Sequence, residues 1–145
     1  KSKPLVVNGA ETRWRILGKY DLVATNEDGT IGLIDCKVSD SQRDSGQFYS
    51  PQLEAYAFSL ENPAAGKAQT VASIGLLVWK PTTAIGTSVD DYGFGVFQKY
   101  VPVERDQANF LTVIGELIDV LEGELPDSGP ECPTCNYLNA RNALD

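Results

Sequence analysis

Several residue types that serve common enzymes are missing from this chain or scarce in it. Its 145 residues include no histidine, no methionine and only three cysteines. The absence of histidine excludes histidine-dependent catalytic triads, histidine-ligated zinc and a histidine general base. No apolar run approaches the roughly 20 residues that a membrane span needs, and no secretory signal is visible. We therefore expect no membrane partner.

The number and spacing of the cysteines indicate the redox compartment of the protein. Cys36, Cys132 and Cys135 make an odd count and lack the spacing of a disulfide framework. This pattern fits a reducing compartment, so we expect a cytoplasmic protein.

The chain begins at Lys1 rather than at a methionine, which suggests a domain excised from a longer protein. Its length predicts a single domain over residues 1–145.

Acidic side chains outnumber basic ones, and the formal net charge is −8. This balance argues against a protein that coats nucleic acid by charge alone. Residues 1–50 hold seven basic and seven acidic side chains, whereas the other 95 residues hold five basic and thirteen acidic ones. The C-terminal excess could simply keep the domain soluble. Four cations could line a phosphate path or form a scattered solvated face: Arg13, Arg15, Lys19 and Arg43.

The order of apolar runs and turn signals predicts a mixed sheet with helices packed on it, in the α/β class. Strands are expected at residues 4–7 and 12–17, in a hairpin within 18–37, and at 71–79 and 92–103. Helices are expected to begin at Ser50, as N-cap, and after Asp106. Residues 39–50 and 81–91 are expected to be loops. Trp79 and Tyr100 could stack on bases, although aromatic residues in apolar strands usually belong to the core.

The hairpin within residues 18–37 contains charged residues where burial of a charge is costly. Its turn signal is Asp28-Gly29. With a two-residue loop, Asp21 would face Cys36. With a three-residue loop that ends in a left-handed glycine, Asp21 would lie opposite Asp35, with Cβ atoms about 5 Å apart. We favour the three-residue loop.

This register has consequences for both faces of the hairpin. Lys37 joins Asp21 and Asp35 on one face, because alternate strand residues point the same way. Two carboxylates so close repel each other unless a cation lies between them, and oxygen ligands suit magnesium or manganese. Alternatively, the aspartates are surface residues and Lys37 merely pairs with one of them. The other face is expected to be buried and holds Tyr20, Leu22, Ile34 and Cys36.

The next helix adds Gln52 and Tyr56, which share a helix face at i and i+4. The ordered set of Gly-x-x-Asp at residues 18–21, Asp-x-Lys at 35–37 and Gln-x-x-x-Tyr at 52–56 resembles the PD-(D/E)XK nuclease superfamily. It looks most like the RecB-like branch, which includes the RecB and AddB nuclease domains and the CRISPR-associated RecB-like exonucleases. These motifs cover residues 14–60, and a looser resemblance extends over most of the chain.

The resemblance implies a restriction-endonuclease-like fold and a role for each motif residue. Asp21, Asp35 and the Cys36 carbonyl would bind Mg²⁺ or Mn²⁺. Lys37 would orient or help deprotonate the attacking water and offset charge in the transition state. Gln52 and Tyr56 would position the substrate or support the metal site, and Lys19 and Arg43 would contact the substrate.

The implied activity is metal-dependent hydrolysis of DNA in repair, recombination or phage- or CRISPR-related processing. An exonuclease that works with a helicase or another DNA-processing protein fits this branch. A catalytically weak nuclease-fold module that binds DNA or protein within a larger assembly is the alternative. A third possibility is an acidic structural protein.

The chain departs from the RecB-like pattern in two places. Many members carry a further histidine or glutamate on an upstream helix, and here the nearby acidic residue Glu11 is not assigned to that role. Some relatives bind an iron-sulfur cluster through four cysteines, whereas the tail at residues 127–145 has two and carries Arg141 at a further position. An iron-sulfur cluster is therefore not expected. The Cys-x-x-Cys pair could be vestigial, share a metal between chains or form a redox pair.

Overall fold

The computed structural model describes residues 1–39, 46–86, 91–124 and 129–143. The chain divides into two compact units, Lys1–Thr112 and Val113–Asp145. The first unit contains every strand and the first helix of the described chain. Within the described residues, no helix combines the length and apolar character needed to cross a bilayer.

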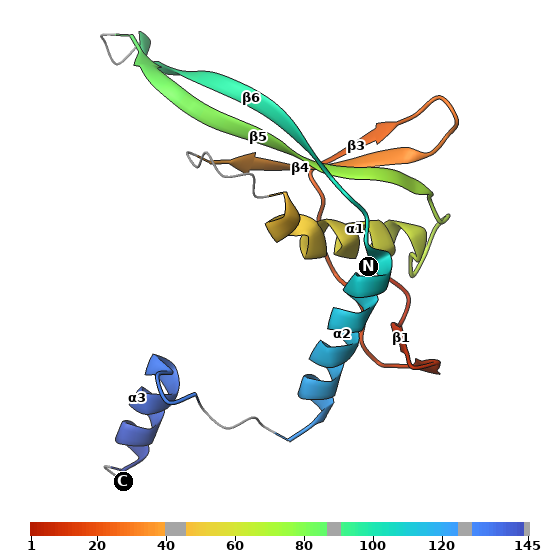
Figure 1. Cartoon of the computed structure of the whole chain (residues 1–145), viewed down its shortest axis with the longest axis vertical. Helices are drawn as coiled ribbons and strands as arrows, with labels where there is room; N and C mark the ends of the chain where they lie inside the picture. The colour runs from red at the N-terminus through yellow and green to blue at the C-terminus, as the bar shows by residue number, and fades with distance from the viewer. Residues whose placement is uncertain (40–45, 87–90, 125–128, 144–145) are drawn as a thin grey trace. The chain divides into compact units, whose positions relative to one another are not determined.

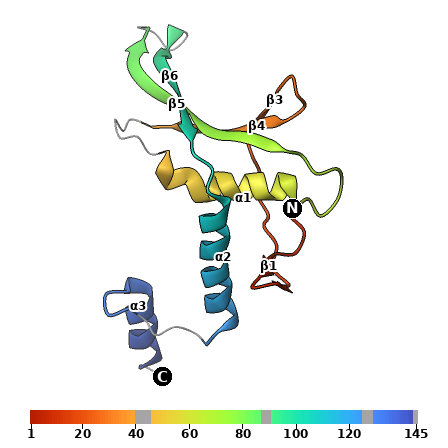
Figure 2. The ribbon, with the colours of Figure 1, turned by 45° about the vertical axis from the view of Figure 1, so that its right-hand side comes forward.

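A four-stranded sheet in the order β3-β4-β5-β6 forms the centre of the first unit (Figure 1). β4 and β5 are parallel, and the two outer pairs are antiparallel. α1 connects the parallel strands and lies against one face of the sheet in both ribbon views (Figures 1 and 2). The predicted mixed α/β architecture is confirmed. Its elements are Leu22–Thr25 (β3), Ile31–Val38 (β4), Ser50–Glu61 (α1), Val71–Ile85 (β5) and Gly93–Val103 (β6).

Five smaller or later elements complete the described chain. A short hairpin precedes β3, and a single 3-10 turn leads into α1. Two further helices follow β6. These elements are Val6–Val7 (β1), Ala10–Glu11 (β2), Gln47–Tyr49 (η1), Gln107–Glu122 (α2) and Pro133–Asn142 (α3).

The hairpin between β3 and β4 has the predicted three-residue loop. Gly29 has a φ of +81°, and its N–H donates to the Asn26 carbonyl at 3.0 Å. The Asn26 N–H donates to the Thr30 carbonyl at 2.9 Å. The ladder that follows pairs Leu22 with Ile34, and Asp21 and Asp35 are the next residue of each segment beyond that pair. A left-handed glycine therefore sets the register on which the site depends.

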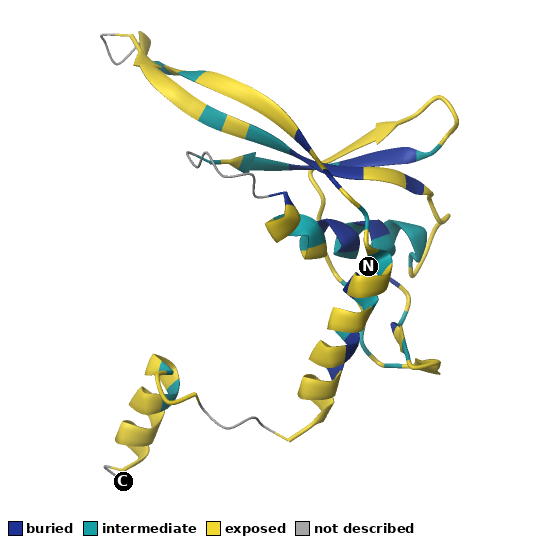
Figure 3. Cartoon of the chain, in the orientation of Figure 1, coloured by how far each residue is buried: buried dark blue, intermediate teal, exposed yellow. Residues whose placement is uncertain are grey.

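Apolar side chains fill the space between α1 and the sheet, where Figure 3 shows the buried stretches of β4, β5 and α1. Leu33, Leu53 and Ala57 have no exposed surface, and Ile74 and Leu76 are 1% exposed. Each fully buried leucine or isoleucine contributes about 1.5–3 kcal/mol. This packing holds α1 against β4, and the polar residues of both elements are held with it.

The buried face of the hairpin is the opposite of the one predicted. Tyr20 and Leu22 are 42% and 46% exposed, whereas Leu33 and Asp35 are 0% and 3% exposed. Both faces of β4 carry apolar residues, so the alternation of residues could not show which face α1 would cover. The crossover places α1 on the Asp35 face, and the aspartate becomes a buried charge.

Helix boundaries follow the predicted signals with one correction. α1 ends at Glu61, before Asn62, as expected. Ser50 is the first helical residue rather than the N-cap, because Tyr49 occupies that position without a side-chain capping bond. For α2, the Asp106 carboxylate accepts from the Asn109 N–H at 3.0 Å, and this is the predicted cap.

The predicted loop at residues 81–91 is wrong in its first half, because β5 continues to Ile85. β4 ends opposite Trp79, so later residues of β5 have no neighbour on that side. A proline is tolerated at such an edge, and a register shift follows Pro81. Residues 87–90 lie outside the described part of the chain.

Two further expectations are corrected. Residues 12–17 form no strand, and the early hairpin is β1–β2, closed by Asn8 and Gly9 with φ values of 51° and 79°. Trp79 and Tyr100 are 41% and 46% exposed and so are not core residues. They lie on the sheet face opposite α1, where β5 and β6 leave aromatic rings uncovered.

Candidate active site

Asp35 and Lys37 lie two residues apart on β4 and point toward α1. Asp35 is 3% exposed, and its Oδ2 atom lies 2.7 Å from Lys37 Nζ. An isolated buried carboxylate would be very costly, so this ion pair is a condition for burying Asp35. Burial lowers the pKa of Lys37, but the close contact with Asp35 and the nearby Tyr49 and Tyr56 outweigh it, and the net pKa is raised.

Gln52 and Tyr56 reach the same carboxylate from α1. Gln52 Nε2 donates to Asp35 Oδ1 at 3.2 Å and to Tyr56 Oη at 2.8 Å. Lys37 Nζ donates to Gln52 Oε1 at 3.3 Å. One amide thus orients both charged partners, which is why these two residues occur one helical turn apart. We call Asp35, Lys37, Gln52 and Tyr56 the Asp35 cluster.

Two more residues shape this cluster. A Cβ atom on Gly18 would lie 2.6 Å from Tyr56 Cε1. The Gly-x-x-Asp spacing therefore has a steric reason, because the chain passes directly over the tyrosine ring. Tyr49 was not predicted as a site residue, and its ring centroid lies 4.6 Å from Lys37 Nζ. Its position three residues before Gln52 was the available signal, since i and i+3 residues share a helix face.

Asp21 immediately precedes the first residue of β3, Leu22. Its Oδ2 atom accepts from the Cys36 N–H at 2.8 Å. The N–H and C=O of one strand residue point to the same side, so the Cys36 carbonyl is also directed toward the β3 edge. β3 begins at Leu22 and pairs there with Ile34, so its ladder stops short of Cys36. Burial and the charges of Asp21 and Asp35 raise the pKa of the Cys36 thiol.

The donor set fits a hard divalent cation. Asp35 Oδ2 is buried and, apart from its ion pair with Lys37, has no hydrogen-bond partner among the described residues. Asp21, Asp35 and the Cys36 carbonyl are the residues that could hold Mg²⁺ or Mn²⁺. Within the described chain no three His, Cys, Asp or Glu side chains gather around one point. Magnesium bound through one or two carboxylates usually keeps several waters.

The two predicted substrate contacts have different outcomes. Lys19 is exposed and lies two residues before Asp21. Arg43 lies outside the described residues. No interaction among the described residues joins Lys19 to the Asp35 cluster.

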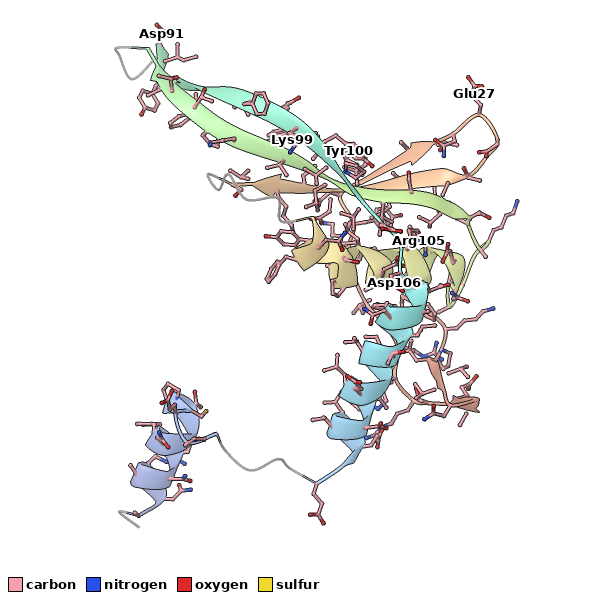
Figure 4. All side chains as sticks on the ribbon, in the orientation of Figure 1. Glu27, Asp91, Lys99, Tyr100, Arg105 and Asp106 are labelled. Atoms are coloured by element: carbon pink, nitrogen blue, oxygen red, sulfur yellow. The ribbon has the colours of Figure 1, made fainter. Side chains whose placement is uncertain are left out.

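A second polar cluster was not predicted from the sequence. Glu54 on α1 is 1% exposed, and Arg105, just after β6, donates to Glu54 Oε2 at 3.1 Å and to Glu61 Oε1 at 2.7 Å. The Asp106 N–H donates to Glu54 Oε1 at 2.7 Å. Arg105 also donates to the Val71 carbonyl at 2.7 Å. We call Glu54, Glu61 and Arg105 the Arg105 cluster, shown in part in Figure 4.

The tail cysteines cap a helix in the second unit. Cys132 Sγ accepts from the Cys135 N–H at 3.5 Å at the start of α3. This hydrogen bond lowers the pKa of Cys132, and the contact with Cys132 raises the pKa of Cys135. Among the described residues no further ligand completes a metal site with them.

Comparison with known proteins covers nearly the whole chain. The family model of the PD-(D/E)XK nuclease superfamily matches residues 2–140. No curated protein and no solved structure matches the chain. The family match includes β3, β4 and α1 with all the residues of the Asp35 cluster. The chain belongs to the PD-(D/E)XK nuclease superfamily.

Proposed function

We propose that this chain is a divalent-metal-dependent nuclease that hydrolyses DNA phosphodiester bonds, an exonuclease of the RecB-like branch. The observation that carries the proposal is the buried Asp35 carboxylate, with one oxygen on Gln52 and the other, among the described residues, facing only Lys37. Family membership supports the reaction class. Roles in DNA repair, recombination or phage- or CRISPR-related processing, beside a helicase, belong to the same proposal.

Each residue has a separate task in this reaction. Asp21, Asp35 and the Cys36 carbonyl would hold Mg²⁺ or Mn²⁺, which supplies a more acidic water and neutralises phosphate charge. Lys37 would orient the attacking water and offset the negative charge that grows on the phosphate oxygens. Gln52 fixes Lys37 and Asp35 relative to each other at 3.3 and 3.2 Å, and Tyr56 holds Gln52 through its hydroxyl group.

A catalytically weak module is the second candidate. The observation that favours it is that, among the described residues, no three His, Cys, Asp or Glu side chains gather around one point, so that only two carboxylates and one carbonyl would hold the cation. Such a module would bind Mn²⁺ or DNA without hydrolysing the DNA.

Cleavage assays with matched variants separate the two candidates. We would incubate the protein with linear single- and double-stranded DNA and Mn²⁺, beside Asp35→Ala, Lys37→Ala and the exposed control Lys67→Ala. Loss of cleavage in the first two variants alone supports the nuclease, and resistance of a circular single strand supports an exonuclease. Absence of wild-type cleavage, with calorimetric Mn²⁺ binding that Asp35→Ala loses, supports the module instead.

A further inference from the structure

All charged side chains of the four-stranded sheet lie on one of its faces. The strands β3 to β6 carry only four charged residues, namely Asp35, Lys37, Lys80 and Lys99. Asp35 and Lys37 pair with Leu76 and Val78 of β5. Lys80 follows Val78 by two residues, and Lys99 lies opposite Val78. Paired residues share a face, and so do residues two apart, so all four point to the α1 side.

The two additional lysines extend from the candidate active site along β5 and β6. Lys37, Val78 and Lys99 form one row across three strands, which places Lys99 about 10 Å from Lys37 in the backbone. Lys80 lies opposite Phe97 and diagonal to Lys99, about 7–8 Å away. The three lysines therefore follow one another along a single path.

The path of the three lysines begins where α1 covers the sheet and continues to a part of the sheet that is exposed. Val78 still packs against the core, whereas Lys99 is exposed and Phe97 is 59% exposed. β4 ends opposite Trp79, so Lys80 and Phe97 belong to a two-stranded ribbon that continues beyond it. Figure 3 shows this ribbon as largely exposed, and Figure 4 labels Lys99 on β6.

We propose that Lys99, Lys80 and Phe97 bind a single strand of DNA next to the active site, with phosphates on the two lysines and one base stacked on Phe97. The proposal rests on the proposed nuclease function, because it extends the substrate path of the same site. Charge complementarity supports it, since the chain has a net charge of −8 and these two lysines place cations on the sheet beside the active site. An exposed aromatic ring between cations is the usual platform for unpaired bases.

The opposite face of the ribbon is the natural comparison. It also exposes aromatic residues, with Phe94 at 60% and Tyr100 at 46%. Among the residues of β3 to β6, however, it carries no charge that would attract phosphate. Phe94 and Phe97 thus have almost equal exposure on one strand and differ in the face they occupy.

Binding of a fluorescein-labelled oligothymidylate of about 15 nucleotides tests the proposal. We would measure anisotropy at several salt concentrations, with EDTA present so that the strand is not hydrolysed. Lys80→Ala/Lys99→Ala should weaken binding about tenfold or more at low salt and reduce the slope of log K against log[salt] by about 1.4, which is 0.7 for each lost phosphate contact. Lys80→Arg/Lys99→Arg should keep the wild-type slope.

Phe97→Ala should weaken binding of the single strand at least fivefold and leave a blunt duplex of the same length unaffected, because paired bases are not free to stack. Phe94→Ala and Lys67→Ala are the matched controls and should bind as the wild type does. An unchanged slope in the double alanine variant would overturn the proposal, as would equal weakening in the controls or a wild type that does not bind the strand.

Failure of this proposal can be told apart from failure of the proposed function. Asp35→Asn should lose Mn²⁺-dependent cleavage and bind the strand no more weakly than the wild type does. The ribbon variants, Lys80→Ala/Lys99→Ala and Phe97→Ala, should raise the KM for DNA cleavage and leave kcat within about twofold of the wild-type value. If cleavage fails in the wild type while the ribbon variants still weaken binding, only the nuclease function is refuted. If cleavage depends on Asp35 while the ribbon variants bind normally, only the ribbon proposal is refuted.

Discussion

The Asp35 cluster and the Arg105 cluster each contain a buried carboxylate, Asp35 on β4 and Glu54 on α1, and they differ in how completely that carboxylate is hydrogen-bonded. Glu54 Oε1 accepts from the Asp106 N–H at 2.7 Å and Oε2 accepts from Arg105 at 3.1 Å. Asp35 Oδ1 accepts from Gln52 at 3.2 Å, while Oδ2 faces Lys37 and has no hydrogen bond of good geometry from the part of the chain that the structure describes. One α-helix thus serves two polar clusters of different character.

This difference separates a structural role from a chemical one. A satisfied cluster holds elements together, and Arg105 joins α1 to the first residue of β5, Val71, and to the chain after β6. A carboxylate oxygen without a hydrogen bond costs stability, and it can bind a cation. We therefore expect substitutions in the Arg105 cluster to change stability and those in the Asp35 cluster to change activity.

The largest expected effect is on cleavage by Asp35→Asn. Loss of a metal ligand should lower kcat/KM about 10³-fold or more, which corresponds to about 4 kcal/mol of transition-state stabilisation. The free energy of unfolding should fall by no more than about 1 kcal/mol, because the Lys37 side chain is 25% exposed and can keep its charge in contact with water. Cleavage assays and urea unfolding check both parts. A large loss of stability would show that Asp35 is a structural residue like Glu54.

Arg105→Leu tests the other side of the comparison. It leaves Glu54, whose side chain is 1% exposed, without its cation, and we expect a loss of about 3–5 kcal/mol in urea unfolding. Mn²⁺-dependent activity per folded molecule should remain within about threefold of wild type. Lys67→Leu, at an exposed position, is the control and should be near neutral. Stability within about 1 kcal/mol of wild type would contradict a structural role for Arg105.

Gly18→Ala should have an intermediate effect on both properties. The added Cβ would lie 2.6 Å from the Tyr56 ring, which must move and weaken its bond to Gln52. Overpacking of this kind costs about 1–3 kcal/mol, and activity should fall with it. Gly93→Ala has open space around the added atom and serves as control. Equal behaviour of the two variants would show that Gly18 does not position Tyr56.

The smallest expected effect lies in the exposed turn, outside both clusters. Hydrogen bonds from the Thr30 side chain and N–H lower the pKa of Asp28 below its ordinary value of 3.8. The stabilisation is present above that value and is lost as the pH falls through the lower pKa of the folded state. Asp28→Asn should therefore reduce the difference between the urea unfolding midpoint at pH 6 and the midpoint at a pH below the folded-state pKa of Asp28. If the variant keeps the wild-type pH dependence, the hydrogen bonds between Asp28 and Thr30 do not contribute to stability.

The sequence was most informative where local chemistry decides the structure. The Asp-Gly turn predicted the register in which Leu22 pairs with Ile34, and helical spacing placed Gln52 beside Tyr56. The face that α1 covers could not be predicted, because both faces of β4 carry apolar residues and a tertiary crossover decides between them. The Arg105 cluster was missed for a related reason, since Glu54 and Arg105 are 51 residues apart and no local pattern links them.

The most direct test of the central claim is a manganese-soaked crystal measured for anomalous scattering. We predict a peak in contact with the carboxylates of Asp21 and Asp35 and with the Cys36 carbonyl, and no such peak in Asp35→Asn. A soaked wild-type crystal without a peak between these residues would contradict the account, as would a peak that persists unchanged in Asp35→Asn.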